Sequence, residues 1–241
     1  MRGIRVVVPI ALLLVGLTAC ATEAARPERD TTPIATATAR APEPTPPSAT
    51  PGTTAPATQE PGARPKQVPR MLRATMRIPS IGVHALPVVP YRGSPDDGPG
   101  TRIQNGGVAA SPFGSRGGVG PGQVGNYIVT AHRTTAPAPF AELPSLRRGD
   151  RVVVRAGGKV FEYRVARTRS TSFRSRRSLA RQAAAVPGRP GVPARRAMIT
   201  LSTCATPEDH ARGNFWADEF GNPEHRIDKV GVLVETRPER P

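Results

Sequence analysis

The residue best placed for covalent chemistry is Cys204, which ends the apolar, β-branched stretch 197–204 (AMITLSTC). This composition predicts a strand, and the Ala-Thr-Pro that follows predicts a turn. A side chain at a strand end is held rigidly and is still open to substrate. Because a lone cysteine is also commonly a buried structural thiol, its position alone leaves a nucleophile and a core residue as alternatives.

His132 and Arg226 are candidate partners of this thiol. His132 follows the predicted strand 125–131 (GNYIVTA), and Arg226 opens the predicted strand 227–235. If both strands are neighbours of strand 197–204, the three side chains meet at one end of the sheet. An imidazolium beside a thiol favours the thiolate that attacks carbonyl carbon. A guanidinium is a permanent cation that can stabilise the resulting oxyanion.

Other residues compete for these roles. His210 and His225 flank the long loop before the final strand, and either is an alternative base or metal ligand. Together with Cys204 and His132 they could in principle bind zinc, but their spacing matches no standard zinc pattern and there is no second thiolate. Arg212 lies in the same loop and is the alternative to Arg226. The residue types therefore favour covalent acyl transfer without a metal.

The elements that must position these residues are mostly short strands. Alternating or β-branched stretches are separated by turn residues, and the Gly- and Pro-rich stretch 91–122 predicts an irregular loop, as does 205–224. Several short strands with little helix predict a mainly β fold, a closed β-barrel with one or two short helices. The strands expected are 73–79, 83–89, 125–131, the hairpin 151–155 and 160–167, 197–204 and 227–235, and the helices are 140–146 and 175–185.

Only part of the 241-residue chain can form a core. Residues 21–70 are dominated by Pro, Thr and Ala, and such a segment buries too little apolar surface to offset its ordering entropy, so it predicts a disordered tether. Residues 71–241 are ample for a single catalytic domain. The net charge of +16 comes almost wholly from arginine and favours attraction to anionic surfaces.

The N-terminal residues 1–20 predict export. Two arginines precede a short apolar run, and the Leu-Thr-Ala-Cys that ends at Cys20 resembles a bacterial lipobox. The run is shorter than the ~20 residues that a membrane-spanning helix needs. We therefore expect lipidation of Cys20 and tethering to the extracellular face of the bacterial cell membrane, with an uncleaved signal anchor as the alternative. Capping Cys20 leaves Cys204 a free thiol in an oxidising compartment, which favours a chemical role for it.

The chain resembles a sortase, and among sortases an actinobacterial class E-like one. The thiol motif preceded by its histidine and followed by its arginine, in that order, is the specific part of the resemblance. The matching segments are 77–83 (RIPSIGV), 131–135 (AHRTT), 139–140 (PF), Leu143, Leu146, 149–150 (GD), 200–204 (TLSTC) and 226–227 (RI).

The resemblance implies a sortase β-barrel and a cysteine transpeptidase. Cys204 would be the nucleophile, His132 the general acid and base, and Arg226 the residue that binds the oxyanion and orients the substrate. Thr203 and Thr200 would contact the substrate. Trp216, in the loop 205–224, would form a lid or wall of the groove, or simply pack that loop onto the barrel.

The resemblance also implies the reaction. The substrate would be a secreted protein with a C-terminal LPxTG or LAxTG sorting signal, cleaved between Thr and Gly. The acyl-enzyme on Cys204 would be resolved by an amine of a peptidoglycan precursor or of a pilin lysine. Acyl transfer through a thioester needs no metal or organic cofactor.

Alternative classes fit the sequence less well. An L,D-transpeptidase places different residues around its cysteine, and NlpC/P60 hydrolases place the cysteine before the histidine. A non-catalytic cell-wall lipoprotein would keep Cys204 as a core residue. The arginine content alone suggests nucleic-acid binding, but export and the scarcity of aromatic residues among the arginines argue against a nucleic-acid partner.

Overall fold

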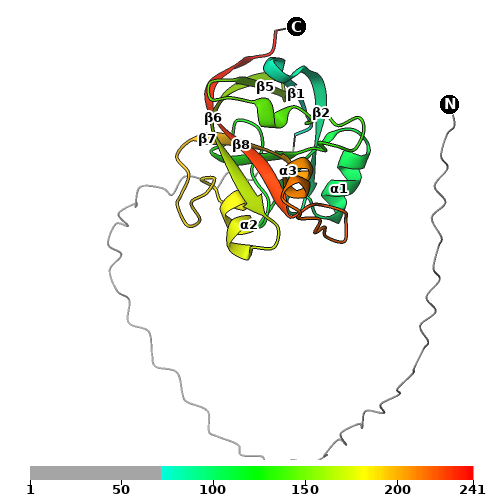
Figure 1. Ribbon diagram of the computed structural model, residues 1–241. Coiled ribbons are helices and arrows are strands. Elements are labelled where there is room, and N and C mark those ends of the chain that lie inside the picture. The colour runs from blue at the N-terminus through cyan, green and yellow to red at the C-terminus, as the bar shows by residue number, and fades with distance from the viewer. Residues whose placement is uncertain (1–71, 241) are drawn as a thin grey trace, which may run out of the picture. The chain divides into compact units, whose positions relative to one another are not determined.

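A computed structural model describes residues 72–240 and contains eight strands closed into one barrel, in the order β1-β2-β3-β4-β7-β8-β6-β5 (Figure 1). The mainly β barrel expected from the sequence is thereby confirmed. The export signal, the Cys20 lipidation site and the tether lie outside the described residues. The strands are β1 (Ala74–Ile78), β2 (Val83–Arg92), β3 (Ala109–Phe113), β4 (Gly125–Thr130), β5 (Arg151–Ala156), β6 (Lys159–Ser172), β7 (Ala197–Cys204) and β8 (His225–Pro238).

Short helices lie outside the barrel wall (Figure 1). They are α1 (Gly98–Asn105), α2 (Arg176–Ala183) and α3 (Thr206–Ala211), with 3-10 turns η1 (Pro79–Ile81) and η2 (Leu143–Ser145). Within residues 72–240 no helix is both long and apolar enough to cross a membrane.

Strands β4 and β7 are buried along almost their whole length. All residues of β4 are buried, and in β7 only the last residue, Cys204, is partly exposed. β-Branched and aromatic residues make up most of β4, and apolar and small residues make up most of β7, which suits strands that are covered on both sides. The thiol therefore lies where a rigid strand leaves the core.

Strand pairing brings three strand ends together. β4 pairs with β7 in parallel, with Thr130 opposite Ser202, and the pairing extends through a hydrogen bond from the Ala131 amide to the Ser202 carbonyl. β7 pairs with β8 in the antiparallel sense, with Cys204 directly opposite Arg226. The C-terminal ends of β4 and β7 and the N-terminal end of β8 thus share one mouth of the barrel.

The predicted irregular loop 91–122 was wrong, because it contains α1 and β3. Asp97 caps α1 by accepting a hydrogen bond from the Gly100 amide, and proline in the first turn fits a helix start, where its missing N–H is not needed. β3 tolerates Pro112 because it pairs with β2 there, while β4 reaches it only at Ala110. A Gly- and Pro-rich composition therefore concealed two regular elements.

Other boundaries differ more modestly. The helix predicted at 140–146 is reduced to the 3-10 turn η2, and the loop 205–224 contains the short helix α3. The hairpin 151–155 and 160–167 is confirmed, but β6 continues to Ser172 because β8 pairs along its whole length. The helix expected at 175–185 is confirmed as α2.

A buried lysine ties η2 to the sheet. Lys229 of β8 is 4% exposed, and its Nζ donates to the carbonyls of Pro144 and Leu146 and to Thr168 Oγ1 at 2.8, 2.7 and 3.0 Å. Burial lowers the pKa of this ammonium group, against the opposing effect of Asp150. The lysine acts as a structural clamp, because its side chain binds the carbonyls of Pro144 and Leu146 and so holds the irregular segment around η2 on the sheet.

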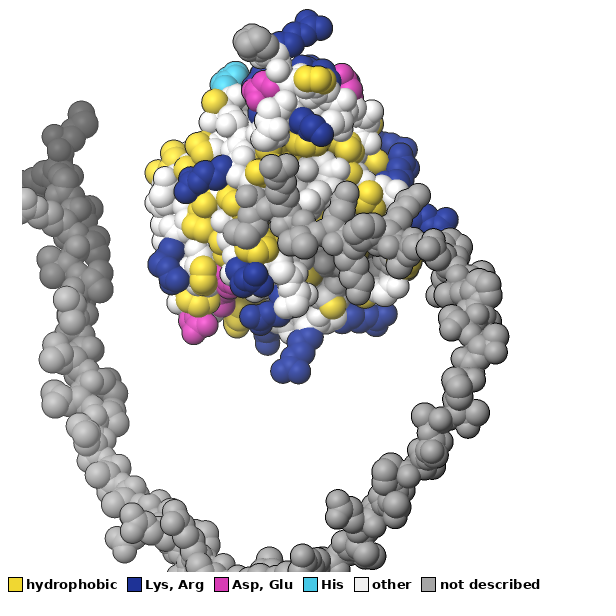
Figure 2. Space-filling model, turned by 180° about the vertical axis from the view of Figure 1, so that it is seen from behind, with side chains coloured by type: hydrophobic (Ala, Val, Ile, Leu, Met, Phe, Trp, Pro, Cys, Tyr) yellow, Lys and Arg dark blue, Asp and Glu magenta, His cyan; other side chains and the backbone are white. Residues whose placement is uncertain are grey.

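On the face seen in Figure 2, Lys and Arg side chains are scattered and do not form one continuous band, and few Asp or Glu side chains lie among them. Such a surface has a general attraction for anions without a single oriented stripe of charge.

Candidate active site

The structure brings Cys204, Arg226 and His132 to the same mouth of the barrel. Cys204 and Arg226 are cross-strand partners. His132 comes two residues after Thr130, whose partner Ser202 is two residues before Cys204. Because β4 and β7 run in parallel, His132 therefore lies level with Cys204.

Arg226 is fully buried, with 0% of its surface exposed. Its Nε donates to Asp96 Oδ2 at 3.0 Å, and its Nη1 donates to the Pro223 and His225 carbonyls at 3.2 and 3.4 Å. The guanidinium carbon lies 4.1 Å from the centre of the Phe173 ring, a cation–π contact. Among the described residues, Nη2 has no hydrogen-bond partner. Nη2 is therefore a buried donor without an acceptor within the described part of the chain.

His132 is half-buried and is held by the last residue of α1. Its Nε2 lies 2.7 Å from Asn105 Oδ1. An amide oxygen can only accept, so Nε2 carries the proton and Nδ1 is left as the basic nitrogen. Burial lowers the pKa of His132, Arg226 lowers it further and Asp96 opposes both. The neutral imidazole is thus the resting form at neutral pH.

Cys204 is a free, partly exposed thiol. Burial raises its pKa, and the neighbouring carboxylates Asp96 and Asp218 raise it further, while Arg226 and Arg133 lower it. The neutral thiol is thus the resting form, and attack requires that its proton pass to a base. A neutral imidazole at the same mouth is suited to accept it.

Arg133, which follows His132, also contacts the thiol-bearing residue. Its Nη1 donates to the Cys204 carbonyl at 3.4 Å. Both of its terminal nitrogens bind the carboxylate of Glu208 in α3, Nη2 at 2.9 Å. This pair fixes the turn after β7 against the turn after β4.

The residues expected to contact substrate are engaged within the sheet or loop. Thr200 Oγ1 donates to Asn126 Oδ1 at 2.7 Å, and Thr203 Oγ1 donates to the Ala131 carbonyl at 2.8 Å. Trp216 is partly buried in the β7–β8 connection, with the Arg174 guanidinium 5.9 Å from its ring centre. Contact of all three with substrate stays a prediction.

The competing residues are placed differently. His225 Nδ1 lies 2.7 Å from Asp209 Oδ1, so this ring is held by α3. His210 packs on Phe215, with ring centres 4.8 Å apart, and Arg212 is exposed at the end of α3. Within residues 72–240 no group of three or more His, Cys, Asp or Glu side chains could hold a metal ion. Arg226, rather than Arg212, is opposite the thiol.

Sequence reasoning missed the residues that hold the histidine and the arginine. Asp96, Gln104 and Asn105 all lie in the stretch predicted to be irregular, and Phe173 directly follows the last residue of β6. The signal that could have found them is Asp-Asp-Gly-Pro at 96–99, since Asp before Gly-Pro is typical of a capped helix start.

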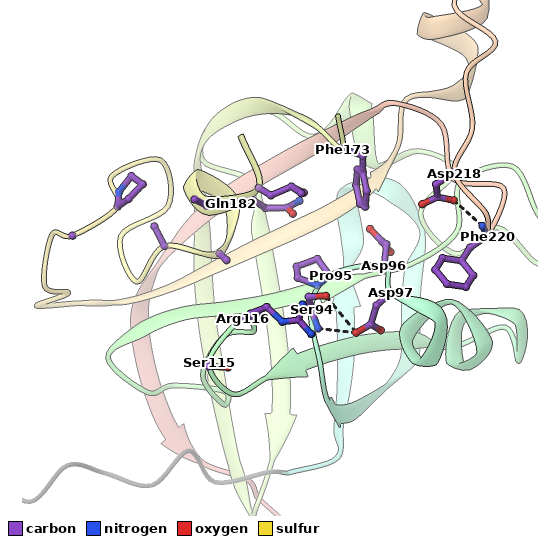
Figure 3. A pocket seen from close by; sticks show the side chains of 16 residues that line it. Ser94, Pro95, Asp96, Asp97, Ser115, Arg116, Phe173, Gln182, Asp218 and Phe220 are labelled. Carbon is purple, nitrogen blue, oxygen red and sulfur yellow. Dashed lines mark hydrogen bonds between the residues drawn. The ribbon is translucent and has the colours of Figure 1, made fainter. Parts of the chain in front are cut away.

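A cavity of about 630 Å³ adjoins the arginine (Figure 3). It lies between the β2–α1 turn, α2 with the loop after it, and the β7–β8 connection, and its walls include Asp96 and Phe173, which hold Arg226. Its apolar wall is formed by Pro95, Phe173, Leu179, Ala183, Pro190 and Phe220.

Comparison with known proteins agrees with this arrangement. A Sortase domain model matches residues 76–218. Sortase E from Streptomyces avermitilis is 25% identical, with a TM-score of 0.50, over 68% of this chain and 89% of that one. The match to the domain model ends before Arg226, so the assignment of that residue rests on its geometry.

Two further structures share the fold. Sortase E1 from Streptomyces coelicolor, solved with a tripeptide in its active site, is 24% identical with a TM-score of 0.51 over 70% of this chain and 91% of that one. The SrtA sortase from Actinomyces oris is 21% identical with a TM-score of 0.53 over 73% and 89%. No curated protein sequence matches the chain.

The domain match covers more than half of the chain, and the barrel carries a cysteine, a histidine and an arginine at one mouth. These findings set aside the L,D-transpeptidase, NlpC/P60 and non-catalytic alternatives. The chain belongs to the sortase family and is a cysteine transpeptidase.

Proposed function

We propose that this sortase cleaves a C-terminal LPxTG- or LAxTG-type sorting signal between Thr and Gly and transfers the protein to an amine. The observation that carries the proposal is the fully buried Arg226, whose Nη2 has no partner among the described residues and whose strand position is opposite Cys204. This arrangement supplies a nucleophile and a fixed hydrogen-bond donor for the oxygen of the carbonyl that it attacks.

The first half-reaction forms the acyl-enzyme. Cys204 Sγ attacks the threonine carbonyl carbon as its proton passes to Nδ1 of His132, and Arg226 Nη2 donates to the developing oxyanion. Collapse of the tetrahedral intermediate breaks the Thr–Gly bond, and His132 returns its proton to the departing glycine amine. The threonine is left as a thioester on Cys204.

The second half-reaction releases the thiol. An amine from a peptidoglycan precursor or from a pilin lysine attacks the thioester carbonyl, and the new amide forms as the Cys204 thiolate leaves. The proton lost by the amine passes through His132 back to the sulfur. The same three side chains thus serve both steps, and the reaction needs no cofactor.

The cavity beside Arg226 supports a substrate with apolar residues before its threonine. Phe173, Leu179 and Ala183 give it an apolar wall, which suits the Leu-Pro or Leu-Ala of a sorting signal. We assign the apolar residues before the threonine to this cavity and the scissile bond to the space between Cys204 and Arg226.

Peptides test the reaction directly. Purified enzyme is incubated with LPETG- and LAETG-containing peptides and an amine acceptor, and products are identified by mass spectrometry. We expect cleavage after threonine and an acceptor-linked product, both absent in Cys204→Ala. Full activity of Arg226→Ala together with loss of activity in Arg212→Ala would move the oxyanion role to Arg212.

We also infer that the enzyme is tethered to the extracellular face of the cell membrane through Cys20. The support is the lipobox-like sequence that ends there. Metabolic labelling with a fatty-acid analogue should label the wild-type chain and leave Cys20→Ala unlabelled. Equal labelling of both, or of neither, contradicts lipidation at this residue.

A further inference from the structure

We propose that Asp96, itself held by Gln104, is the positioning residue that aims the guanidinium of Arg226. The turn and helix formed by residues 94–105 then determine which nitrogen of the guanidinium remains for substrate. This inference rests on the proposed function, in which Arg226 binds the oxyanion.

Every oxygen of Asp96 has a partner. Oδ2 accepts from Arg226 Nε at 3.0 Å, and Oδ1 accepts from Gln104 Nε2 at 2.7 Å. The main-chain carbonyl accepts from Thr101 Oγ1 at 3.3 Å and from Asn222 Nδ2 at 3.2 Å. Because Asp96 is 5% exposed and Gln104 is 4% exposed, these bonds are shielded from water. The carboxylate therefore has one orientation, set by α1.

The backbone at Asp96 is held against its own preference. Its φ is 57°, in the left-handed region that non-glycine residues seldom occupy. The next residue, Asp97, begins α1 by capping it and also accepts a hydrogen bond from the Ser94 amide. The turn is thus fixed on both sides, and it directs the Asp96 side chain toward Phe173, as Figure 3 shows.

The guanidinium is in turn held on three sides. Asp96 takes the Nε edge, the carbonyls of Pro223 and His225 take Nη1, and Phe173 covers one face at 4.1 Å. A fully buried guanidinium without a counter-charge would be strongly disfavoured, so the carboxylate also lets the cation remain in the core. These contacts leave Nη2 as the guanidinium nitrogen without an acceptor among the described residues.

The same helix holds the other proposed partner of the thiol. Gln104 and Asn105 are consecutive residues at the end of α1, and they bind Asp96 and His132 respectively. One short helix therefore sets both the donor and the base of the reaction relative to the β7 strand end.

The negative charge of Asp96 also acts on Cys204. Burial raises the pKa of the Cys204 thiol, and the charge of the Asp96 carboxylate raises it further. Removing the charge should therefore ease thiolate formation, while removing the anchor should release the guanidinium. A residue that merely stabilises the fold would not separate these two effects.

The alternative is that Asp96 occupies the arginine in place of the substrate oxygen and must leave before catalysis. In that case its removal would raise the rate of transfer. The positioning role predicts slower peptide transfer by Asp96→Ala, and the blocking role predicts faster transfer.

The experiment compares Asp96→Ala, Asp96→Asn and the control Glu235→Gln in the full-length protein. Glu235 lies toward the end of β8 opposite to Arg226, and its exposed carboxylate pairs only with Arg237 among the described residues, at 3.5 Å. We expect kcat for peptide transfer to fall roughly ten- to hundredfold in Asp96→Ala, since a buried charge-assisted hydrogen bond is lost, and by less in Asp96→Asn, which can still accept from Nε. Iodoacetamide alkylation of Cys204 should move to lower pH in both. Glu235→Gln should keep both properties near the wild type.

A measurement without substrate separates this inference from the proposed function. The Nε–H of Arg226, assigned by its loss in Arg226→Lys, should give a slowly exchanging NMR signal that survives in Asp96→Asn and is lost in Asp96→Ala. An unchanged signal in Asp96→Ala, or a transfer rate equal to or above the wild type, overturns the positioning role. Failure of the wild-type enzyme to transfer any peptide overturns the proposed function instead, and the NMR result still tests the anchor.

Discussion

The hydrogen bond between His132 and Asn105 can be altered by a single side-chain atom. Asn105→Asp replaces the amide with a carboxylate next to Nε2, at the site of the present 2.7 Å contact. A neighbouring anion favours the imidazolium, so the pKa of His132 should rise, against the burial that now lowers it. Asn105→Ala removes the contact without adding charge.

The size of the effect follows from the kind of bond. A neutral hydrogen bond contributes about 0.5–1.5 kcal/mol, and this one lies near solvent, so loss of the bond in Asn105→Ala should lower kcat/KM about threefold to tenfold. In Asn105→Asp the acid limb of the pH profile should move to higher pH. The histidine must be neutral to accept the thiol proton, and it then remains protonated to a higher pH.

Two measurements check this reasoning. Titration of the His132 ring by NMR, assigned with His132→Gln, reports its pKa, and peptide transfer over a range of pH gives the rate profile. Gln123→Glu is the matched control, since this amide in the β3–β4 loop accepts only from the Gly120 amide. Unchanged kcat/KM in Asn105→Ala, or an acid limb in Asn105→Asp that coincides with the wild type, would refute a role for Asn105 in holding the base.

Three further predictions concern the thiol, the core lysine and the aromatic ring. Alkylation of Cys204 should have its midpoint above the ~8.5 of a free cysteine, because burial raises the pKa of this thiol, and a midpoint below that value would contradict the neutral resting state. Lys229→Met should lower the free energy of unfolding by about 2–4 kcal/mol, since it leaves two carbonyls unpaired. Urea unfolding measures this change, and a loss below ~1 kcal/mol would contradict a structural role for Lys229. Phe173→Leu removes the cation–π contact and should lower kcat several-fold with folding intact, whereas an unchanged kcat would show that the ring does not help to hold Arg226.

The barrel and its reactive mouth could be predicted because they depend on local pattern. The stretch that ends at Cys204 is β-branched and apolar, and the stretch before His132 is similar, so each could be assigned as a strand with a polar residue at its end. Which strands pair is a long-range property, but parallel β4–β7 pairing and antiparallel β7–β8 pairing put the three residues at one mouth, as the hypothesis required.

The residues that hold the site could not be predicted from the sequence. Asp96 and Asn105 bind partners 130 and 27 residues away, and no local pattern encodes such a contact. The helix that carries Asn105 begins with Gly-Pro-Gly, a composition more typical of a loop. Its stability comes from the Asp97 cap and from packing on β3 and β2, which are tertiary effects.

In the proposed reaction the sulfur of Cys204 carries the acyl group. The most direct measurement is the intact mass of the full-length enzyme after brief reaction with an LPETG or LAETG peptide without an acceptor, followed by peptide mapping of the adduct. We expect a mass increase equal to the acyl group of the peptide fragment that ends at threonine, located on Cys204 and removed by an added amine. Cleavage without any adduct on Cys204, or an equal adduct in Cys204→Ala, would contradict acyl transfer through this sulfur.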